Sequence, residues 1–273
     1  MIRDITIGQY YPAKSVIHKL DPRTKLFGTL VFIISVFLFH SIAGYAVATV
    51  FLAGMILIST VPVKFIFKGL KAIFMILLIT MVFNIFLTPG EALVSFGIFK
   101  ITKEGLSMAV RMAIRLVYLV IGSSLMTLTT TPNQLTDGLE KSLRPLNKIH
   151  VPVHEIAMIM SIALRFIPIL LEETDKIMKA QIARGADLES GNMIQKAKSM
   201  IPILVPLFVS AFRRANDLAM AMEARCYRGG EGRTKMKPLK YHKEDRMAYI
   251  TVIAYVILVV VIGRCVPVHI WVF

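Results

Sequence analysis

The first regular feature of the chain is a long stretch of hydrophobic residues near its N-terminus. From Leu26 to Val63 there is no Asp, Glu, Lys or Arg. A helix needs about 20 apolar residues to cross roughly 30 Å of hydrocarbon, so this stretch is long enough for two membrane spans. His40, Ser41 and Gly44 supply polar and turn-forming residues near its middle. They predict a hairpin between the two spans.

Three further apolar stretches predict three more spans. They run from about Ala72 to Thr88, from about Leu106 to Leu128 and from Met247 to Gly263, and the first of them stops at Pro89-Gly90. Five spans place the two chain ends on opposite sides of the membrane. The pattern therefore predicts an all-α membrane protein with about five transmembrane helices.

Between the fourth and fifth spans, the apolar residues recur with helical spacing. The cluster Thr129-Thr130-Thr131-Pro132-Asn133 favours a helix start, and a short helix over about 133–148 is predicted. Two long amphipathic helices follow, because apolar positions recur every three or four residues. These positions are Val153, Ile156, Met160, Ala163, Ile167, Leu170, Thr174, Ile177 and Gln181 in the first helix, and Met193, Ile201, Leu204, Phe208, Ala211, Ala215, Leu218 and Met222 in the second. A kink or break is expected near Pro168.

Basic residues predict the orientation, because Lys and Arg in short connections favour the cytoplasm. They gather in the N-terminal tail and after the second span, at Arg3, Lys14, Lys19, Arg23, Lys25, Lys64, Lys68 and Lys71. The opposite connections hold few, namely Lys100, Lys103 and Arg264. We expect a cytoplasmic N-terminus, an extracytoplasmic C-terminus and a cytoplasmic module over residues 129–246. The membrane parts are then 1–128 and 247–273, and the two amphipathic helices lie along the inner interface.

Composition supports a membrane protein and limits its chemistry. The chain of 273 residues is 56% hydrophobic, with a mean hydropathy of +0.67 and a net charge of +15. Its basic residues alternate with apolar runs, which favours anionic lipid over nucleic acid. We find no phosphate-binding loop, catalytic acid pair, nucleophile with a base, or cofactor motif, so an enzyme is not expected. His150 and His154 with Glu155 lack a third ligand for a metal.

Both amphipathic helices end in similar tripeptides, Ala183-Arg184-Gly185 and Ala224-Arg225-Cys226. A guanidinium always carries charge and binds a carboxylate with a rigid pair of donors, so it suits docking to an acidic groove. The other explanation is that Arg184 and Arg225 neutralise the negative C-terminal ends of their helices.

The ordered set of motifs resembles the transmembrane T component of energy-coupling factor (ECF) transporters. Besides the two tripeptides, it includes residues 18–25 (His-Lys-Leu-Asp-Pro-Arg-Thr-Lys), Arg165-Phe166-Ile167-Pro168 followed by Glu172-Glu173, and Ala221-Met222-Glu223-Ala224-Arg225. These motifs extend along most of the chain. The second tripeptide departs from the pattern, because Cys226 stands where Gly is usual.

The resemblance implies a noncatalytic subunit of an ATP-driven importer of a vitamin or metal ion. Each tripeptide would lie on a coupling helix that docks in one of two ABC-type ATPases. Residues 129–246 would then be a cytoplasmic coupling module of two long amphipathic helices and a short one. A small membrane-embedded substrate-binding S component would be the other partner. Soft methionine side chains adapt to different surfaces, and we expect Met158, Met160, Met200 and Met220 to contact it.

Two other classes of function compete with this interpretation. A stand-alone secondary carrier or channel would be expected to carry ionisable groups in interrupted spans, and a membrane enzyme would need reactive side chains there. Arg111 and Arg115 are the charged residues inside the expected fourth span. They either pack and extend toward the outer surface, or contact a substrate-binding partner.

Overall fold

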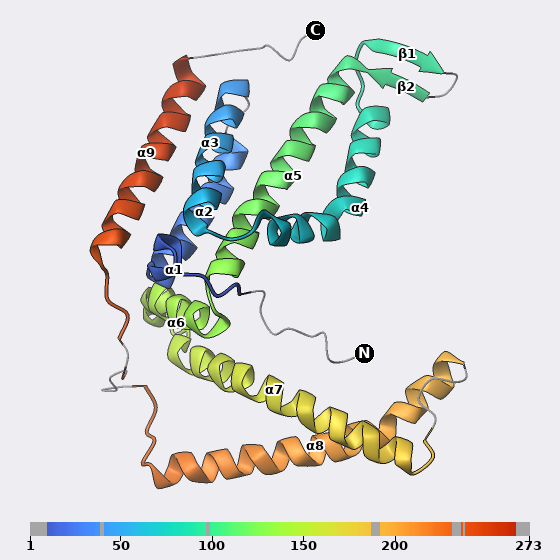
Figure 1. The fold of residues 1–273 in the computed structure, drawn as a ribbon, viewed down its shortest axis with the longest axis vertical. Helices are drawn as coiled ribbons and strands as arrows, with labels where there is room; N and C mark the ends of the chain where they lie inside the picture. Colours follow the sequence, from blue (N-terminus) through green and yellow to red (C-terminus); the bar gives the residue numbers. More distant parts are fainter. Residues whose placement is uncertain are drawn as a thin grey trace. The chain divides into compact units, whose positions relative to one another are not determined.

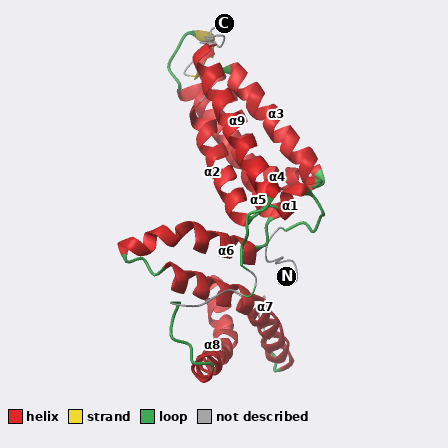
Figure 2. Ribbon diagram, turned by 90° about the vertical axis from the view of Figure 1, so that its left-hand side faces the viewer, coloured by secondary structure: helices red, strands yellow, loops and turns green. Residues whose placement is uncertain are grey.

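The computed structural model describes residues 10–38, 41–96, 99–186, 192–230, 236 and 238–265. Almost all of these residues are helical (Figures 1 and 2), which confirms the all-α membrane fold. The α-helices are α1 Val16–Lys19, α2 Pro22–Leu38, α3 Ile42–Ser59, α4 Val63–Leu87, α5 Lys103–Thr129, α6 Pro132–Leu143, α7 Val153–Ala183, α8 Met193–Ala224 and α9 Lys243–Cys265. A 3-10 helix, η2, covers Arg144–Ile149. Arg3 and His40, which entered the predictions, lie outside the described residues.

The chain forms two compact units. The first, here called the membrane unit, contains the described residues from 10 to 139 and from 239 to 265. The second, here called the arm unit, contains the described residues from 140 to 238. The boundaries between the two units fall within α6 and just before α9. The division into membrane and cytoplasmic parts at 128/129 and 246/247 stays a prediction.

Five helices in the described residues are long and apolar enough to cross a membrane: α3, α5, α7, α8 from Ile194, and α9. Of the predicted spans, α3, α5 and α9 belong to this set. The described part of α2 has 17 residues, just under the length of α3. Length and composition alone also admit α7 and α8, so placing these two helices along the interface remains a prediction from topology.

Helix α4 differs from the predicted third span. It starts at Val63, and its segments Val63–Lys71 and Ile73–Leu87 are bent by 56°. The connection expected after the second span is therefore a helical segment. Its lysines, Lys64, Lys68 and Lys71, recur every three or four residues and are all exposed. In the sequence, these charges interrupt the apolar run and therefore suggest a loop.

A β-hairpin connects α4 to α5 and was not predicted. Strand β1 (Ala92–Phe96) pairs antiparallel with β2 (Phe99–Thr102), with Ala92 opposite Thr102 and a shift in register before Val94. Thr102 then caps α5, because its Oγ1 accepts the Gly105 N–H at 3.1 Å. Helix α5 consequently starts three residues before the expected Leu106.

The core of the membrane unit lies among α2, α3, α5 and α9, which run side by side in Figures 1 and 2. Its buried side chains are Phe32, Val36, Tyr45, Ala48, Leu52, Tyr255 and Val259. Phe51 stacks on Tyr255 with ring centroids 4.3 Å apart. A Cβ atom at Gly122 would lie only 2.8 Å from the Phe32 ring, so glycine lets α5 approach α2 closely. The Tyr255 hydroxyl is hydrogen-bonded to Ser35 Oγ at 2.9 Å.

In the segment after α5, the predicted helix start is confirmed. Thr131 Oγ1 accepts the Gln134 N–H at 3.3 Å, and Gln134 Oε1 accepts the Thr131 N–H at 3.2 Å. These reciprocal bonds form a capping box, and Pro132 occupies the first helical position. The short helix predicted over 133–148 is divided between α6 and η2.

Candidate functional site

The first candidate tripeptide ends α7 with a well-formed C-terminal cap. Ala183 is the last helical residue, Arg184 is the cap, and Gly185 adopts a left-handed conformation with φ of +85°. The Gly185 N–H bonds to Ile182 O at 2.9 Å, and the Ala186 N–H bonds to Gln181 O at 3.0 Å. This pair of bonds is the Schellman motif, which satisfies carbonyls that the helix leaves open.

The second tripeptide ends α8 with the same arrangement. Arg225 is the cap, and Cys226 has φ of +55°. The Cys226 N–H bonds to Glu223 O at 2.8 Å, and the Tyr227 N–H bonds to Met222 O at 3.0 Å. The departure from glycine in this tripeptide therefore leaves the cap geometry intact, although a residue with a Cβ occupies the left-handed position.

All six residues of the two tripeptides are exposed. Neither Arg184 nor Arg225 belongs to an ion pair within the described part of the chain. Each guanidinium therefore projects from a helix end whose own partial charge is negative. The negative end of the helix dipole attracts the guanidinium but occupies none of its N–H donors. Each arginine can therefore still bind a carboxylate on another molecule.

The two helix ends lie far apart because α7 and α8 pair in opposite directions, as Figure 1 shows within the arm unit. Gln181 Nε2 donates to Pro202 O at 3.2 Å, and Arg214 donates to Glu173 Oε2 at 3.0 Å. Arg184 and Arg225 each lie eleven residues beyond the Glu173–Arg214 contact, on opposite sides. At 1.5 Å per residue, this places the two arginines about 30 Å apart along the pair.

The four methionines expected to contact a partner do not form a single patch. Met158 is half-buried, whereas Met160, Met200 and Met220 are exposed. Met158 and Met160 lie in the first turns of α7 and Met220 in the last turn but one of α8. Met200 lies toward the other end of the antiparallel pair, near the C-terminal end of α7.

The apolar stripe of α8 is largely exposed, which the sequence does not reveal. Ile203 is buried, but the residues on the other side are more than half exposed: Ile201, Leu204, Val205, Phe208, Val209 and Phe212. Phe208 and Phe212 lie 5.2 Å apart at their ring centroids. They line an open groove of about 550 Å³ that continues onto Arg213, Asn216 and Asp217. The periodicity identified this stripe, but it could not show that α7 covers only one side of α8.

Other candidate residues have structural partners. His154 Nδ1 contacts Glu140 Oε1 at 2.9 Å, and no group of three His, Cys, Asp or Glu residues that could hold a metal occurs among the described residues. In α5, the Arg115 guanidinium lies over the Phe37 ring at 5.3 Å from its centroid. A contact of this kind favours the cation at a site of reduced solvation.

Comparison with known proteins shows the family of the chain. The model of the CbiQ family, described as cobalt transport protein, matches residues 13–236. The energy-coupling factor transporter transmembrane protein EcfT of Clostridium kluyveri is 61% identical over 250 residues, which cover 91% of this chain and 93% of that protein. The chain belongs to the EcfT family of transporter transmembrane proteins.

Other EcfT proteins match over nearly the same length. The EcfT of Acidaminococcus fermentans is 50% identical over 98% of this chain and 100% of its own. The EcfT of Bacillus subtilis is 48% identical over 93% of this chain and 96% of its own. Family membership makes this chain a multi-pass transmembrane component of an energy-coupling factor transporter, a noncatalytic type of subunit.

Proposed function

We propose that this protein is the coupling subunit of an ECF-type importer, which links two cytoplasmic ABC-type ATPases to a small membrane-embedded S component. The observation that carries the proposal is the pair of exposed arginines at two identically capped helix ends, Arg184 and Arg225. The importer would take up a vitamin or a metal ion. The description of the matching family as a cobalt transport protein fits a metal ion, and the names of the EcfT relatives leave the cargo open.

The proposed orientation places both arginines in the cytoplasm. In the membrane unit, Lys14, Lys19 and the three lysines of the first α4 segment are exposed, which favours the cytoplasmic side for this end of the unit. The N-terminus is then cytoplasmic and the C-terminus extracytoplasmic. The module proposed for residues 129–246 follows α5 on the same side.

Each arginine would act as a fixed contact point. A guanidinium in a carboxylate-lined groove makes two parallel hydrogen bonds, so it resists sliding as well as separation. The backbone bonds of the cap hold the residue rigidly at the end of its helix. When ATP binding and hydrolysis move the ATPases, the attached helix ends would move with them, and the displacement would pass along α7 and α8.

The uncovered stripe of α8 supports a contact with the S component. Large exposed apolar patches on a protein usually mark an interface, and an S component embedded in the bilayer presents an apolar surface. Met200 and Met220 lie on the same helix as the stripe, and Met158 and Met160 lie on its partner helix. Replacing these four methionines with leucine would alter the capture of some S components more than others if one surface serves several partners.

The proposal is tested by co-expressing the chain with the two ABC-type ATPases of its own organism and purifying the complex in detergent. The doubly reversed variant, Arg184→Glu with Arg225→Glu, should lose both ATPases. A matched control reverses two exposed lysines outside the two tripeptides, Lys179 and Lys198, and should retain both ATPases. Retention of both ATPases by the arginine variant would refute docking through these residues.

The same purification separates the main alternative, a stand-alone secondary carrier or channel. Arg111 and Arg115 are the observation that favours it, because charged side chains inside a span usually serve a function. A carrier would move substrate in liposomes that contain only this chain, whereas a coupling subunit would require the ATPases and ATP. Transport by the isolated chain would therefore decide against coupling.

A further inference from the structure

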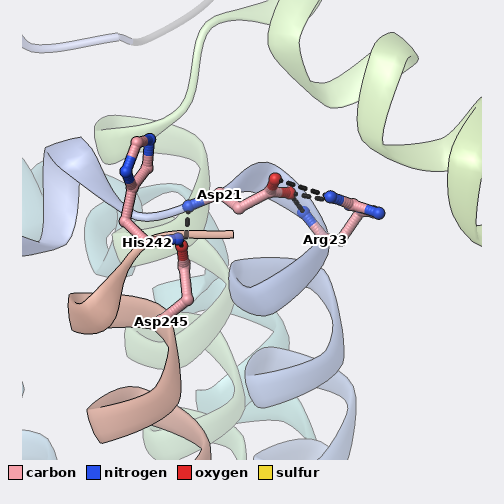
Figure 3. A network of polar contacts seen from close by, with 4 residues as sticks. All are labelled: Asp21, Arg23, His242 and Asp245. Carbon is pink, nitrogen blue, oxygen red and sulfur yellow. Dashed lines mark hydrogen bonds and ion pairs between the residues drawn. The ribbon is translucent and has the colours of Figure 1, made fainter. Parts of the chain in front are cut away.

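A buried carboxylate joins the beginnings of two helices that are far apart in the sequence. The Asp245 side chain is fully buried in the first turn of α9. Its Oδ1 accepts the Asp21 N–H and its Oδ2 accepts the His242 N–H, each at 2.8 Å (Figure 3). One carboxylate therefore caps α9 and holds the residue that precedes α2.

Asp21 is in turn a cap for α2. Its Oδ1 accepts the Arg23 N–H at 2.9 Å and the Arg23 Nε–H at 3.0 Å, and its Oδ2 accepts a second guanidinium N–H at 2.9 Å (Figure 3). The Arg23 guanidinium also lies 4.0 Å from the centroid of the Tyr241 ring. Asp245 thus fixes Asp21, and Tyr241, which lies just before α9, fixes Arg23.

The same segment, residues 21–25, also contacts the end of α5 and the middle of α6. Lys25 is buried in the first turn of α2, and its Nζ donates to Thr129 O at 2.8 Å. Gly138 of α6 lies against Pro22, so closely that a Cβ atom there would be 3.0 Å from the Pro22 Cβ. The beginning of α2 therefore touches α5, α6 and α9.

Along the chain, these contacts lie close to both points at which it passes between the membrane unit and the arm unit. On the outgoing side, α6 is one continuous helix that crosses the unit boundary at 139/140. On the returning side, the boundary at 238/239 lies only a few residues before His242. All the contacting residues belong to the membrane unit. A displacement carried along either connection would therefore act on residues 21–25 as well as on α5 and α9, which the connections enter directly.

We infer that Asp21, Lys25 and Asp245 form a junction hub that delivers displacement of the arm unit into α2 and α9. They are positioning residues for the transport cycle, and this inference rests on the proposed coupling function. Hydrogen bonds to buried charged groups suit this task because they are directional and strong in a site of low dielectric constant. Apolar contacts at the same place would hold the helices together but would let them slide.

Hydrogen–deuterium exchange tests the hub in the purified complex with both ATPases, with and without a non-hydrolysable ATP analogue. In the unmodified complex, the analogue should change exchange in the ends of α7 and α8 and also in residues 20–30 and 240–250. In Asp245→Asn, the N–H of Asp21 or that of His242 faces the NH2 group of the new amide instead of a carboxylate oxygen. Without nucleotide, the exchange rates of the Asp21 and His242 amides should therefore rise about tenfold. The response of residues 20–30 to nucleotide should be lost.

Glu244→Gln is the matched control, because it removes the same charge from the neighbouring, exposed position of α9. Its nucleotide response should equal that of the unmodified chain. Lys25→Met provides a second variant, in which the Thr129 carbonyl loses its donor, and assembly with the ATPases reports that each variant has folded.

Each outcome of this experiment is decisive. A variant that assembles and loses the response only in residues 20–30 and 240–250 supports the hub. A normal response there in either Asp245→Asn or Lys25→Met overturns it. Absence of any response at the ends of α7 and α8 in the unmodified complex contradicts the proposed coupling function itself, and so separates the two failures.

Discussion

The ends of α7 and α8 share a geometry but differ in the residue that makes it possible. Both helices close with the same two backbone hydrogen bonds, and both place an exposed arginine at the cap. The left-handed residue is Gly185 in one and Cys226 in the other, and an L-residue with a side chain pays roughly 1–2 kcal/mol for that conformation. The comparison teaches that the position of the arginine is maintained even where the cap is intrinsically less stable.

The largest expected effect comes from reversing the charge of one arginine at a time. Arg184→Glu and Arg225→Glu should each weaken ATPase binding by about 2–5 kcal/mol, roughly 30- to 4,000-fold in Kd, because a like charge then faces the carboxylates. Binding of each purified ATPase to the detergent-solubilised chain measures this. If the ends serve different ATPases, the two variants lose different ones. Loss of the same ATPase in both variants would mean that both ends bind one ATPase, and it would contradict docking to two.

The next effect separates the two caps. Gly185→Ala should destabilise the end of α7 by about 1–2 kcal/mol, because alanine is strained at φ of +85°. Cys226→Ala should change the end of α8 by less than about 0.5 kcal/mol, because neither residue is glycine. Hydrogen exchange of the amides at residues 185–186 and 226–227 reads each end separately. Equal effects would remove the proposed difference between the caps.

Cys226→Gly should stabilise the end of α8, the opposite of the effect expected for Gly185→Ala on α7. Glycine relieves the strain of the left-handed position, partly offset by its greater freedom in the unfolded chain. We expect the end of α8 to gain up to about 1 kcal/mol, seen as slower exchange of the Tyr227 amide. ATPase binding should remain unchanged, because Arg225 keeps its place. Faster exchange in this variant would show that the cysteine side chain itself stabilises the cap.

The smallest effect is expected at the ion pair between Arg214 and Glu173, which joins α7 and α8 midway between the two tripeptides. Arg214→Met removes the ion pair with Glu173, which is partly exposed on both sides. Such pairs contribute about 0.2–1 kcal/mol, so thermal unfolding should shift only slightly. Arg213→Met is the control, since Arg213 is exposed and outside the ion pairs of the described residues. A shift of several kcal/mol would make the pair a main element of the arm unit.

Local signals in the sequence predicted much of this architecture. Apolar runs located α3, α5 and α9, and the cluster of Thr residues before Pro132 located the start of α6. The repeated Ala-Arg ending located both candidate arginines, because a helix end is determined by a few neighbouring residues. That Cys226 would complete the same cap could not be read from the sequence, since cysteine rarely adopts a positive φ.

Features that depend on distant partners could not be predicted. Asp245 binds a residue 224 positions earlier, and no periodicity connects them. The exposed face of α8 required knowing which side α7 covers. The hairpin β1–β2 was missed because its strands contain only five and four residues, too few for a clear alternating pattern, and the first segment of α4 was missed because three lysines suggested a loop.

The antiparallel pairing of α7 and α8 has a mechanical consequence. Two opposite forces that act across a rigid beam at its two ends cancel as translation, and what remains is a torque. Partners held at Arg184 and Arg225 that move in opposite directions across the helix pair would therefore turn α7 and α8 about their contact. Such a pair would convert opposed movements of two bound proteins into rotation with little net translation.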